Sequence, residues 1–397
     1  MKIMHLSDIH LGKSVGEISM IPDQRYILNE IVKMLQEEKA DVLLIAGDVY
    51  DRNVPSEQAV ELFDEFLYTL SELNLPTIII SGNHDSDERL SFGSRLFSSN
   101  NIYITGKYQG EVPCITLQDE FGPVNFYSLP FVKASLVEHF HHDEGDNCSN
   151  YEAAVETAIK HTKINTEERN VILSHQFVTG AVRPMGEEIA QDGISEGEEP
   201  ILSGSEISAL NVGTLERIRS FVYDAFDYAA LGHIHSPQQV GRESIRYAGS
   251  PLKYSLKEVN NTKTVPIVTL CEKGNVNIEL HELKPLHEMR HIKGRLKDLT
   301  ASENVTDSED YIYCTLTDEN QIQDAMAILQ SYYPNTMRID YDNSHTRALG
   351  KGGLEEEITE RSFGEIMKDF YSKMRGGEPG CEELEILEDA AKEAGII

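Results

Sequence analysis

The clearest pattern in the chain is a series of short apolar runs that each end in polar side chains able to bind metal. One run is residues 77–80, which contain three isoleucines and lead into Gly82-Asn83-His84-Asp85. Such a run predicts a buried strand, and Gly82 permits a sharp turn after it. Open α/β sheets bind ligands at strand ends of this kind. We therefore expect chemistry at this turn if other strands end in the same way.

Four further apolar runs share this habit. They predict strands at residues 2–6, 42–46, 171–173 and 226–231. Between the first three strands, residues 23–39 and 53–73 carry apolar positions at helical spacing, and Asn53 or Ser56 is the expected cap of the second helix. Strands that alternate with helices predict a mainly parallel sheet covered on both faces.

The rest of the chain predicts shorter elements up to about residue 283, followed by a separate small domain and a helical tail. We expect β pieces at 101–130, a helix at 151–160 and a β-rich run to about residue 283. A basic strand, a strand at 311–316, a helix at 321–330 and a strand at 337–341 then predict a small α/β domain. A glycine-rich hinge at 350–353 precedes two amphipathic helices at 362–374 and 382–394. The predicted parts are therefore residues 1–283, 284–349 and 350–397.

The net charge and the cysteine content limit which partners and which compartment the sequence predicts. The net charge is −32 over 397 residues, which by itself argues against a polyanion. The charge is uneven, because residues 186–206 hold seven acids and no Lys or Arg, whereas residues 284–297 are basic. That basic stretch predicts either a contact to DNA phosphates or an edge strand protected by cations. Five scattered cysteines without a CxxC pair indicate a reduced, cytoplasmic protein, and we expect neither a signal peptide nor a membrane span.

The five strand ends together supply seven candidate metal ligands, all of them oxygen or imidazole donors. They are Asp8, His10, Asp48, Asn83, His175, His233 and His235. Such a set suits Mn²⁺, Mg²⁺, Fe²⁺ or Zn²⁺ better than a thiolate zinc site. Seven ligands are too many for one ion and fit two ions that share Asp48. A pair of divalent ions about 3.5–4 Å apart is the usual device for in-line attack on a phosphoester.

The order of these motifs resembles a known family. Asp-x-His, Gly-Asp-x-x-Asp, Gly-Asn-His-Asp and Gly-His-x-His occur in this order in the calcineurin-like metallophosphoesterases. Within that superfamily, the chain is similar to the bacterial SbcD-type nuclease family at SGNHDSDERLSFG (81–93), SHQFVTGA (174–181), LGHIHSP (231–237) and YAGSPLKYS (247–255). The resemblance spans essentially the whole chain and implies two central sheets flanked by helices, a small α/β capping domain and a C-terminal helical tail.

The resemblance also implies a role for each residue. One metal ion would be held by Asp8, His10, Asp48 and His235, and the other by Asp48, Asn83, His175 and His233. His84 would protonate or stabilise the leaving 3′ oxygen, and Asp85 would orient the His84 ring. The loop around Asp48 also resembles one in the serine/threonine phosphatases, where an arginine grips phosphate. Arg52 is therefore either a phosphate contact or a solvated loop residue.

The implied activity is that of a metal-dependent DNA nuclease in recombination, replication and repair. It combines a 3′→5′ exonuclease on double strands with an endonuclease on single strands and hairpins, with Mn²⁺ preferred and Mg²⁺ as the alternative. The implied partners are a second copy of the chain and an SbcC-type ATPase with a long coiled coil, in a heterotetramer docked through the C-terminal helices.

Three alternatives stay open at this point. The same metals could serve a phosphomonoesterase or a cyclic-nucleotide phosphodiesterase. A non-catalytic DNA-end scaffold is the third alternative, although it predicts missing ligands.

Residues 139–142 hold three histidines, but no apolar strand precedes them, and we expect a surface loop there.

Overall fold

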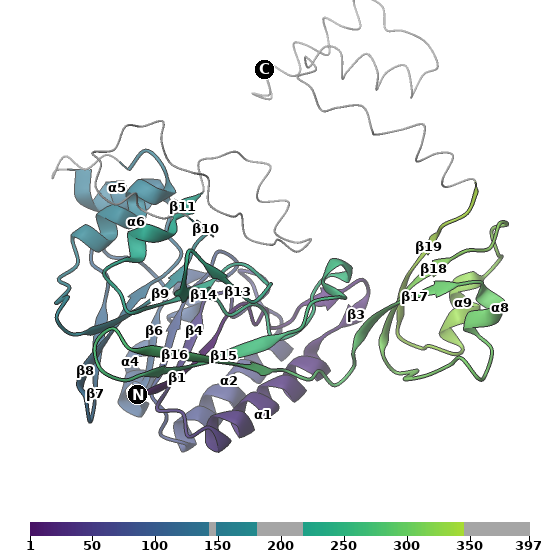
Figure 1. The fold of residues 1–397 in the computed structure, drawn as a ribbon, viewed down its shortest axis with the longest axis horizontal. Coiled ribbons are helices and arrows are strands. Elements are labelled where there is room, and N and C mark those ends of the chain that lie inside the picture. Colours follow the sequence, from purple (N-terminus) through teal and green to yellow (C-terminus); the bar gives the residue numbers. More distant parts are fainter. Residues whose placement is uncertain (143–147, 181–216, 345–397) are drawn as a thin grey trace, which may run out of the picture. The chain divides into compact units, whose positions relative to one another are not determined.

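The computed structural model describes residues 1–142, 148–180 and 217–344 (Figure 1). The predicted acidic loop at 186–206, the hinge at 350–353 and the two C-terminal helices lie outside these residues. The chain divides into two compact units, one of Met1–Thr315 with Asp324–Ile339 and the other of Leu316–Gln323 with Asp340–Ile397. Within the described part, no helix has the length and the apolar content that crossing a bilayer requires.

The first of two large sheets holds the N-terminal strands. Its order is β16 (Val276–Glu282), β15 (Thr264–Leu270), β1 (Lys2–Leu6), β4 (Val42–Ala46), β5 (Thr77–Ile80) and β6 (Ile102–Thr105). The strands from β1 to β6 run parallel, whereas β15 pairs antiparallel with both β1 and β16. Because β1, β4 and β5 are parallel, their carboxyl ends lie at one edge of the sheet.

The second large sheet is built in the same way from later strands. Its order is β13 (Gln238–Val240), β14 (Arg242–Tyr247), β12 (Tyr228–Gly232), β9 (Arg169–His175), β8 (Gly122–Leu129) and β7 (Cys114–Asp119). The four central strands are parallel, and the two edge strands pair antiparallel. The predicted strands at 171–173 and 226–231 are the central β9 and β12.

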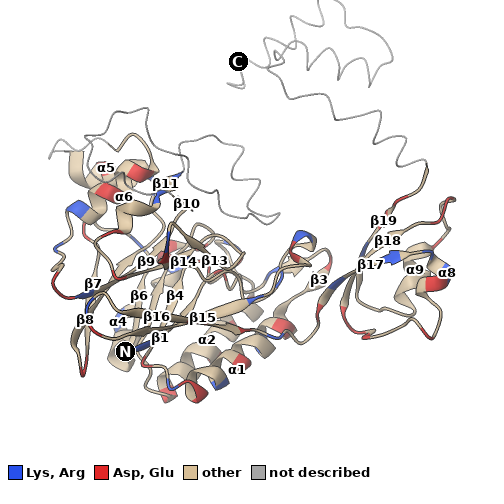
Figure 2. Ribbon diagram, in the orientation of Figure 1, with Lys and Arg blue, Asp and Glu red and all other residues tan. Residues whose placement is uncertain are grey.

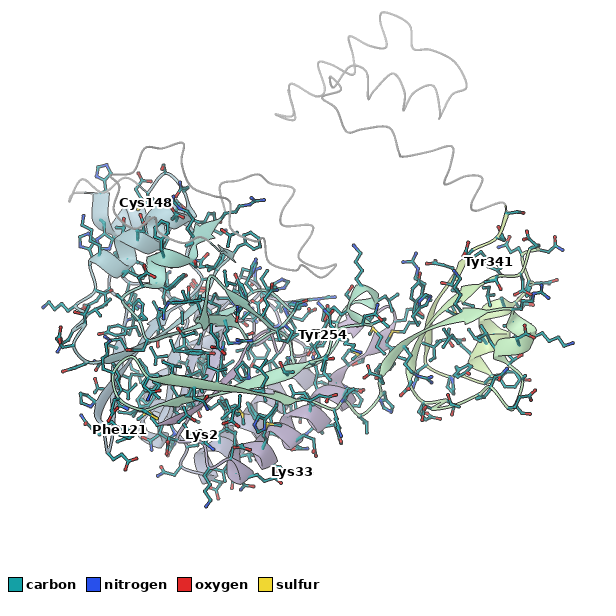
Figure 3. All side chains as sticks on the ribbon, in the orientation of Figure 1. Lys2, Lys33, Phe121, Cys148, Tyr254 and Tyr341 are labelled. Atoms are coloured by element: carbon teal, nitrogen blue, oxygen red, sulfur yellow. The ribbon has the colours of Figure 1, made fainter. Side chains whose placement is uncertain are left out.

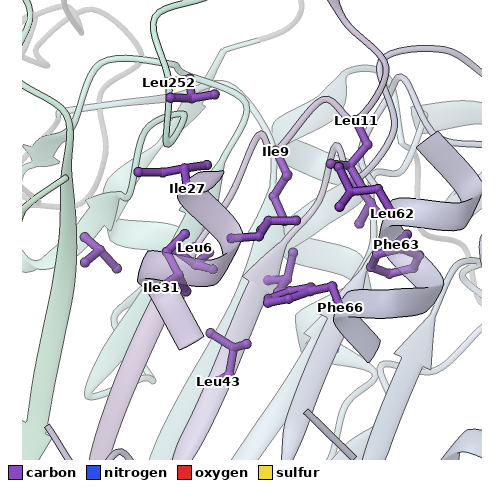
Figure 4. Close-up of a cluster of buried hydrophobic side chains, with 14 of the residues drawn as sticks. Leu6, Ile9, Leu11, Ile27, Ile31, Leu43, Leu62, Phe63, Phe66 and Leu252 are labelled. Atoms are coloured by element: carbon purple, nitrogen blue, oxygen red, sulfur yellow. The ribbon is translucent and has the colours of Figure 1, made fainter. Parts of the chain in front are cut away.

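Helices cover one face of each sheet. Helices α1 (Ile21–Glu37) and α2 (Glu57–Glu72) pack on the first sheet, and α6 (Tyr151–Lys160) packs on the second. Figure 4 shows apolar side chains of α1 and α2 directed at those of β1 and β4. The Ser56 side chain accepts a hydrogen bond from the Ala59 N–H, so Ser56 rather than Asn53 caps α2.

The other faces of the two sheets pack on each other through a third apolar core. Along β1, Ile3 belongs to this inner core while its neighbour Met4 belongs to the core under the helices. The expectation of a mainly parallel sheet covered on both faces is confirmed for each large sheet, with helices on one face and the other sheet on the opposite face. Helices cover only the outer faces, which confirms the expected sandwich of two sheets flanked by helices.

A smaller three-stranded sheet follows, in the order β17 (Met289–Gly294), β18 (Tyr311–Leu316) and β19 (Thr336–Tyr341). Helices α8 (Leu296–Leu299) and α9 (Ala325–Gln330) connect its strands. The basic stretch thus contains an edge strand, β17. Its Arg290 donates to Asp310 Oδ2 at 2.6 Å and to two backbone carbonyls. The Arg290 guanidinium thus forms hydrogen bonds to neighbouring residues of the chain.

The remaining strands form two short pairs. These are β2 (Ser14–Val15) with β3 (Ile18–Ser19), and β10 (Val178–Thr179) with β11 (Ile218–Arg219). The short helical segments are α3 (Asp87–Leu90), α4 (Ser94–Phe97), η1 (Ser98–Asn100), η4 (Ser220–Tyr223) and η5 (Leu256–Glu258).

The histidines at 139–142 do not form the surface loop that the sequence suggested. Helix α5 runs from Ala134 to His141, and the His141 ring is buried. Its Nε2 lies 2.8 Å from the Tyr108 hydroxyl, and the ring stacks on that of His161. A polar stretch can therefore end a helix with one buried histidine when a hydroxyl and a second ring pack against that histidine.

Candidate metal centre

The strand ends of both sheets meet, and they bring all seven expected ligands and His84 into one cluster. The clearest link between the sheets is His175 at the end of β9, whose Nδ1–H donates to the Ala46 carbonyl at the end of β4, at 2.8 Å. Tertiary packing is required for this, because the two strands belong to different sheets.

Asp48 lies between the two sets of histidines. Its Oδ2 is 3.6 Å from His10 Nε2 and 3.3 Å from His175 Nε2. Its Oδ1 accepts the backbone N–H of His84 at 2.9 Å. The Asp48 side chain is buried. One carboxylate therefore faces ligand atoms on both sides, as a group that bridges two ions must.

On one side of Asp48, three ligand groups approach each other. His10 Nε2 and His235 Nε2 lie 3.0 Å apart. Ligand atoms of Asp8, His10 and His235 all lie within 4.8 Å of one another. The Asp8 carboxylate also accepts the His233 N–H at 3.1 Å, which holds the His233 loop against β1. This group offers one oxygen and two nitrogen donors to a single cation.

On the other side, the Asn83 amide oxygen is the meeting point. Asn83 Oδ1 lies 3.1 Å from His175 Nε2 and 3.0 Å from His233 Nδ1. Asp8, Asp48 and His175 form a second group whose ligand atoms lie within 4.8 Å. Oxygen and imidazole donors without thiolate are the set that hard and borderline divalent cations prefer. The residues present therefore fit two divalent ions.

Burial and neighbouring charges together set the charge of these groups. Burial lowers the pKa of His233 to about 3 and that of His10 well below its usual value, so both imidazoles are neutral and able to bind a metal. Burial alone raises the pKa of Asp48, but His175 and His10 hold it well below its usual range. Burial lowers the pKa of His175, but the adjacent Asp48 outweighs this and raises it to about 9.

The position of Asp85 differs from the expected one. Its carboxylate accepts three backbone N–H groups, from Gly82 at 2.9 Å, Val49 at 3.1 Å and Tyr50 at 2.8 Å. The His84 Nδ1–H instead donates to the Asp51 carbonyl at 2.9 Å. Asp85 therefore joins the loops after β4 and β5, and the direct contact expected between Asp85 and the His84 ring is replaced by a backbone carbonyl.

A cavity of about 550 Å³ opens beside His84, lined by Lys13, Asp51, Arg52, Asn53, Asn83 and His84. The Arg52 side chain is 81% exposed and lies 3.5 Å from Asp51 Oδ2. Lys13, which the sequence reading did not single out, bonds Asp51 Oδ1 at 2.6 Å. Two cations thus line the open side of the site, where an anionic substrate would enter.

Sequence reasoning also missed a group of supporting residues behind the ligands. Glu258 and Lys263 form a buried ion pair at 2.6 Å, and Glu258 Oε1 lies 3.5 Å from His235 Nδ1. Gln24 on α1 donates to the His10 carbonyl at 2.7 Å and to the hydroxyl of Tyr254 (labelled in Figure 3) at 3.0 Å. Tyr254 lies in the quoted segment YAGSPLKYS (247–255), whereas Gln24, Glu258 and Lys263 belong to none of the quoted motifs. The only signal is a charged or polar residue within a buried segment.

The chain belongs to the calcineurin-like phosphoesterase family, whose family model matches residues 1–237. Residues 285–375 match a second family, described as the type 5 capsule protein repressor C-terminal domain. Membership and the two ligand groups together indicate that the chain binds divalent metal ions.

Among curated proteins, the chain is similar to a subunit of the nuclease SbcCD from Staphylococcus epidermidis (strain ATCC 12228 / FDA PCI 1200). The two are 31% identical over 381 residues, which cover 94% of this chain and 93% of that protein. Two solved structures are also similar, TT1561 of Thermus thermophilus and a dimetal phosphatase from Danio rerio. Each is 11% identical, with 71% and 72% of this chain covered, 99% and 96% of theirs, and TM-scores of 0.36 and 0.38. At these TM-scores neither likeness bears on function.

Proposed function

We propose that this protein is the nuclease subunit of an SbcCD-type complex, a metal-dependent phosphodiesterase that acts on DNA ends and hairpins. The observation that carries the proposal is the meeting of oxygen and imidazole ligands from five strands around Asp48. The similarity to the staphylococcal nuclease subunit over 94% of the chain selects DNA from among phosphoester substrates. We further propose the cytoplasm as its compartment.

The proposed ligand sets follow the two sides of Asp48. Asp8, His10 and His235 would complete one site with Asp48, and Asn83, His175 and His233 would complete the other. Two bound cations polarise the phosphate and lower the pKa of an attacking water. Mn²⁺ is the proposed ion because the sites mix imidazole with carboxylate and amide oxygen, whereas Mg²⁺ favours oxygen and water.

His84 is the proposed group for the leaving oxygen. Its Nδ1–H is directed to the Asp51 carbonyl at 2.9 Å, so Nε2 is the nitrogen left for substrate. The ring is exposed and lines the 550 Å³ cavity. A protonated Nε2 can donate to the leaving 3′ oxygen, while Lys13 and Arg52 attract the phosphate backbone. Asp85 acts indirectly in this proposal, since it fixes the loop that carries Asn83 and His84.

The strongly acidic composition has to be reconciled with a DNA substrate. Figure 2 shows acidic and basic residues interspersed along the described ribbon. DNA contact would therefore depend on the bound metal ions, on the two cations of the cavity and on the partner ATPase. Contact between DNA phosphates and the basic stretch 284–297 remains part of the proposal. We also propose domain boundaries at 283/284 and 349/350.

The decisive experiment compares linear with closed-circular duplex DNA as substrate, with Mn²⁺ present or chelated, and with or without an SbcC-type ATPase and ATP. We expect Mn²⁺-dependent loss of linear DNA from its 3′ ends and cleavage of hairpins. Absence of cleavage under all of these conditions would contradict the proposed nuclease function. Hydrolysis of nitrophenyl phosphate without any cleavage of DNA would favour a phosphomonoesterase instead.

Association with a second copy of the chain is the other proposed contact. Large apolar side chains are exposed on α2 and in the segment that follows α3, at Val60 (46%), Tyr68 (65%), Phe92 (83%) and Leu96 (76%). A homodimer, within a heterotetramer with two ATPase subunits, would remove them from water.

The dimer is tested by light scattering during gel filtration. We expect Leu96→Glu to produce monomers because it places a charge in the proposed interface. Leu286→Glu, at a leucine that is 46% exposed elsewhere, should leave the dimer intact. A monomeric wild-type chain at micromolar concentration would contradict this contact.

A further inference from the structure

His235 is held from both edges of its ring. On the side of the cluster, its Nε2 lies 3.0 Å from His10 Nε2. On the opposite side, its Nδ1 lies 3.5 Å from Glu258 Oε1, at the upper limit of a hydrogen bond. A ring nitrogen that faces a carboxylate carries the proton, since a carboxylate oxygen can only accept. The other nitrogen then keeps its lone pair for a cation.

Glu258 is fixed by further contacts. It ends the short segment η5 and is fully buried. Its Oε2 is paired with Lys263 Nζ at 2.6 Å and also accepts the Tyr254 N–H at 3.4 Å. Burying a carboxylate is costly unless it is paired and hydrogen-bonded. Here both of its oxygens have a partner, so the group can remain ionised behind His235.

Lys263 closes the arrangement. Besides Glu258, its ammonium donates to the His235 carbonyl at 2.9 Å and to Ser250 Oγ at 2.9 Å. The same cation thus holds the carboxylate and the backbone of the histidine that this carboxylate faces. The three residues form a ring of contacts in which neither Glu258 nor His235 can shift without breaking a bond to Lys263.

Two other rings of the cluster, those of His175 and His84, are anchored differently. His175 Nδ1–H donates to the Ala46 carbonyl and His84 Nδ1–H donates to the Asp51 carbonyl, and both of these acceptors are neutral. His235 faces an anion instead. A carboxylate behind an imidazole raises the basicity of the nitrogen that binds the metal, and loss of such a group typically costs about 10–100-fold in metal affinity.

We propose that Glu258, locked by Lys263, is a positioning residue that fixes the tautomer and the orientation of His235 and so strengthens one of the two metal sites. The inference rests on the proposed function, which provides the two-metal site. It predicts an unequal effect, because Glu258 supports only the site that contains His235 and leaves the site of His175 and His233 unchanged.

The test is a titration of the full-length, chelator-treated chain with Mn²⁺ alone, in which free Mn²⁺ is followed by electron paramagnetic resonance. The wild type should bind two ions. Glu258→Gln, which has nearly the same shape, should bind one ion with unchanged affinity and the other about 10–100-fold more weakly. Two sites with wild-type affinities in a folded Glu258→Gln chain would overturn the inference.

A second variant and a matched control separate positioning from folding. Glu258→Gln combined with Lys263→Met removes both charges and leaves neither of them unpaired, and it should show the same loss at one site. Asp119→Asn breaks another largely buried contact, to Arg169, outside the metal cluster. It should lower the unfolding temperature while both Mn²⁺ affinities stay as in the wild type. Equal weakening by Asp119→Asn would mean that stability alone controls metal binding.

The imidazole ¹⁵N resonances supply a readout that a purely structural role would not move. In the metal-free wild type, His235 should show the Nδ1–H tautomer, and Glu258→Gln should shift it toward a mixture. A wild-type chain that binds no Mn²⁺ would overturn the proposed function and this inference together. Wild-type binding of two ions that Glu258→Gln does not alter would overturn the inference alone.

Discussion

At the scale of single residues, four of the candidate ligands have positive φ angles, a backbone conformation that residues other than glycine rarely adopt. The φ angles of Asp8, His10, Asp48 and His233 are 51°, 48°, 50° and 104°. Each non-glycine residue in such a region costs on the order of 1–3 kcal/mol and persists only where its surroundings hold it. Here the His10 N–H donates to the Asp48 carbonyl at 2.9 Å, which ties two of these loops together. Backbone strain is thus concentrated where the ligand atoms converge.

His84→Gln tests the division between chemistry and metal binding. Loss of a general acid typically costs about 10²–10⁴-fold in rate, so Mn²⁺-dependent cleavage should fall by that factor. Mn²⁺ binding should stay unchanged because His84 is not a proposed ligand. However, ligand atoms of His10, Asp48 and His84 also lie within 4.8 Å. Loss of one bound Mn²⁺ in His84→Gln would therefore reassign His84 as a ligand.

Asp119 makes the pH dependence of stability testable away from the metal site. Its bonds to Arg169, which outweigh its partial burial, hold the Asp119 pKa well below its usual value. A depressed pKa in the folded state stabilises the protein above the unfolded value of about 4, and this contribution is lost as the pH falls further.

Urea unfolding between pH 7 and pH 3 measures the effect of Asp119→Asn. We expect the variant to be less stable than the wild type at pH 7 and the difference to shrink toward pH 3. An equal difference at both pH values would contradict the ionised pair with Arg169.

At the scale of elements, close approach of strand ends builds the site. A Cβ atom on Gly232, the last residue of β12, would lie 1.9 Å from the Ala46 carbonyl of β4. A Cβ on Gly82 would lie 2.1 Å from Asp48 Oδ1. The φ of Gly82 is not positive, so the sequence-based reason for this glycine, a sharp turn, is replaced by lack of space.

Gly232→Ala should therefore force β12 away from β4. We expect a loss of about 1–3 kcal/mol in unfolding free energy, as for overpacked cores, together with weaker Mn²⁺ binding because His233 follows directly. Gly274→Ala is the control, since its Cβ would meet nothing within 4 Å. It should cost about 1–2 kcal/mol for its positive φ and leave metal binding unchanged. Wild-type Mn²⁺ affinity in Gly232→Ala would contradict the role of this contact.

At the scale of the whole molecule, two adjacent residues of α1 contact different parts of the first unit. The buried Asp23 accepts hydrogen bonds from His287 N–H at 3.2 Å and from the Tyr311 hydroxyl. Its neighbour Gln24 donates to the His10 carbonyl. The start of α1 is thereby tied both to residues 287–311 and to the loop that carries a candidate ligand.

Asp23→Ala should loosen residues 287–311 while the two large sheets stay folded. Removing the carboxylate leaves buried donors without an acceptor, at about 1–3 kcal/mol. Amide hydrogen exchange should rise at these residues and stay slow in β4 and β9. Tyr311→Phe, which removes one donor and leaves Asp23 its other bonds, should give a smaller increase. An equal increase in amide exchange over all described residues of Asp23→Ala would contradict a local effect.

The local sequence was sufficient to find the elements that carry the site. The strands at 42–46 and 311–316 and the helix at 151–160 end where the periodicity of apolar residues predicted, because apolar spacing directly reflects burial. The identity of the candidate ligands likewise followed from residue type and from the strand end each one occupies. The ligand assignments themselves stay predictions until metal binding is measured.

Only the tertiary structure decided how these pieces meet. Periodicity shows that both faces of β1 are buried, but not whether a helix or a second sheet covers each face, since either one buries apolar side chains equally well. His10 and His235 are 225 positions apart, and Glu258 and Asp85 gain their partners only when separate loops converge. The sequence by itself determined which ligand types stand at which strand ends, because that information is local. The tertiary structure decided what supports them, because long-range packing brings those contacts together.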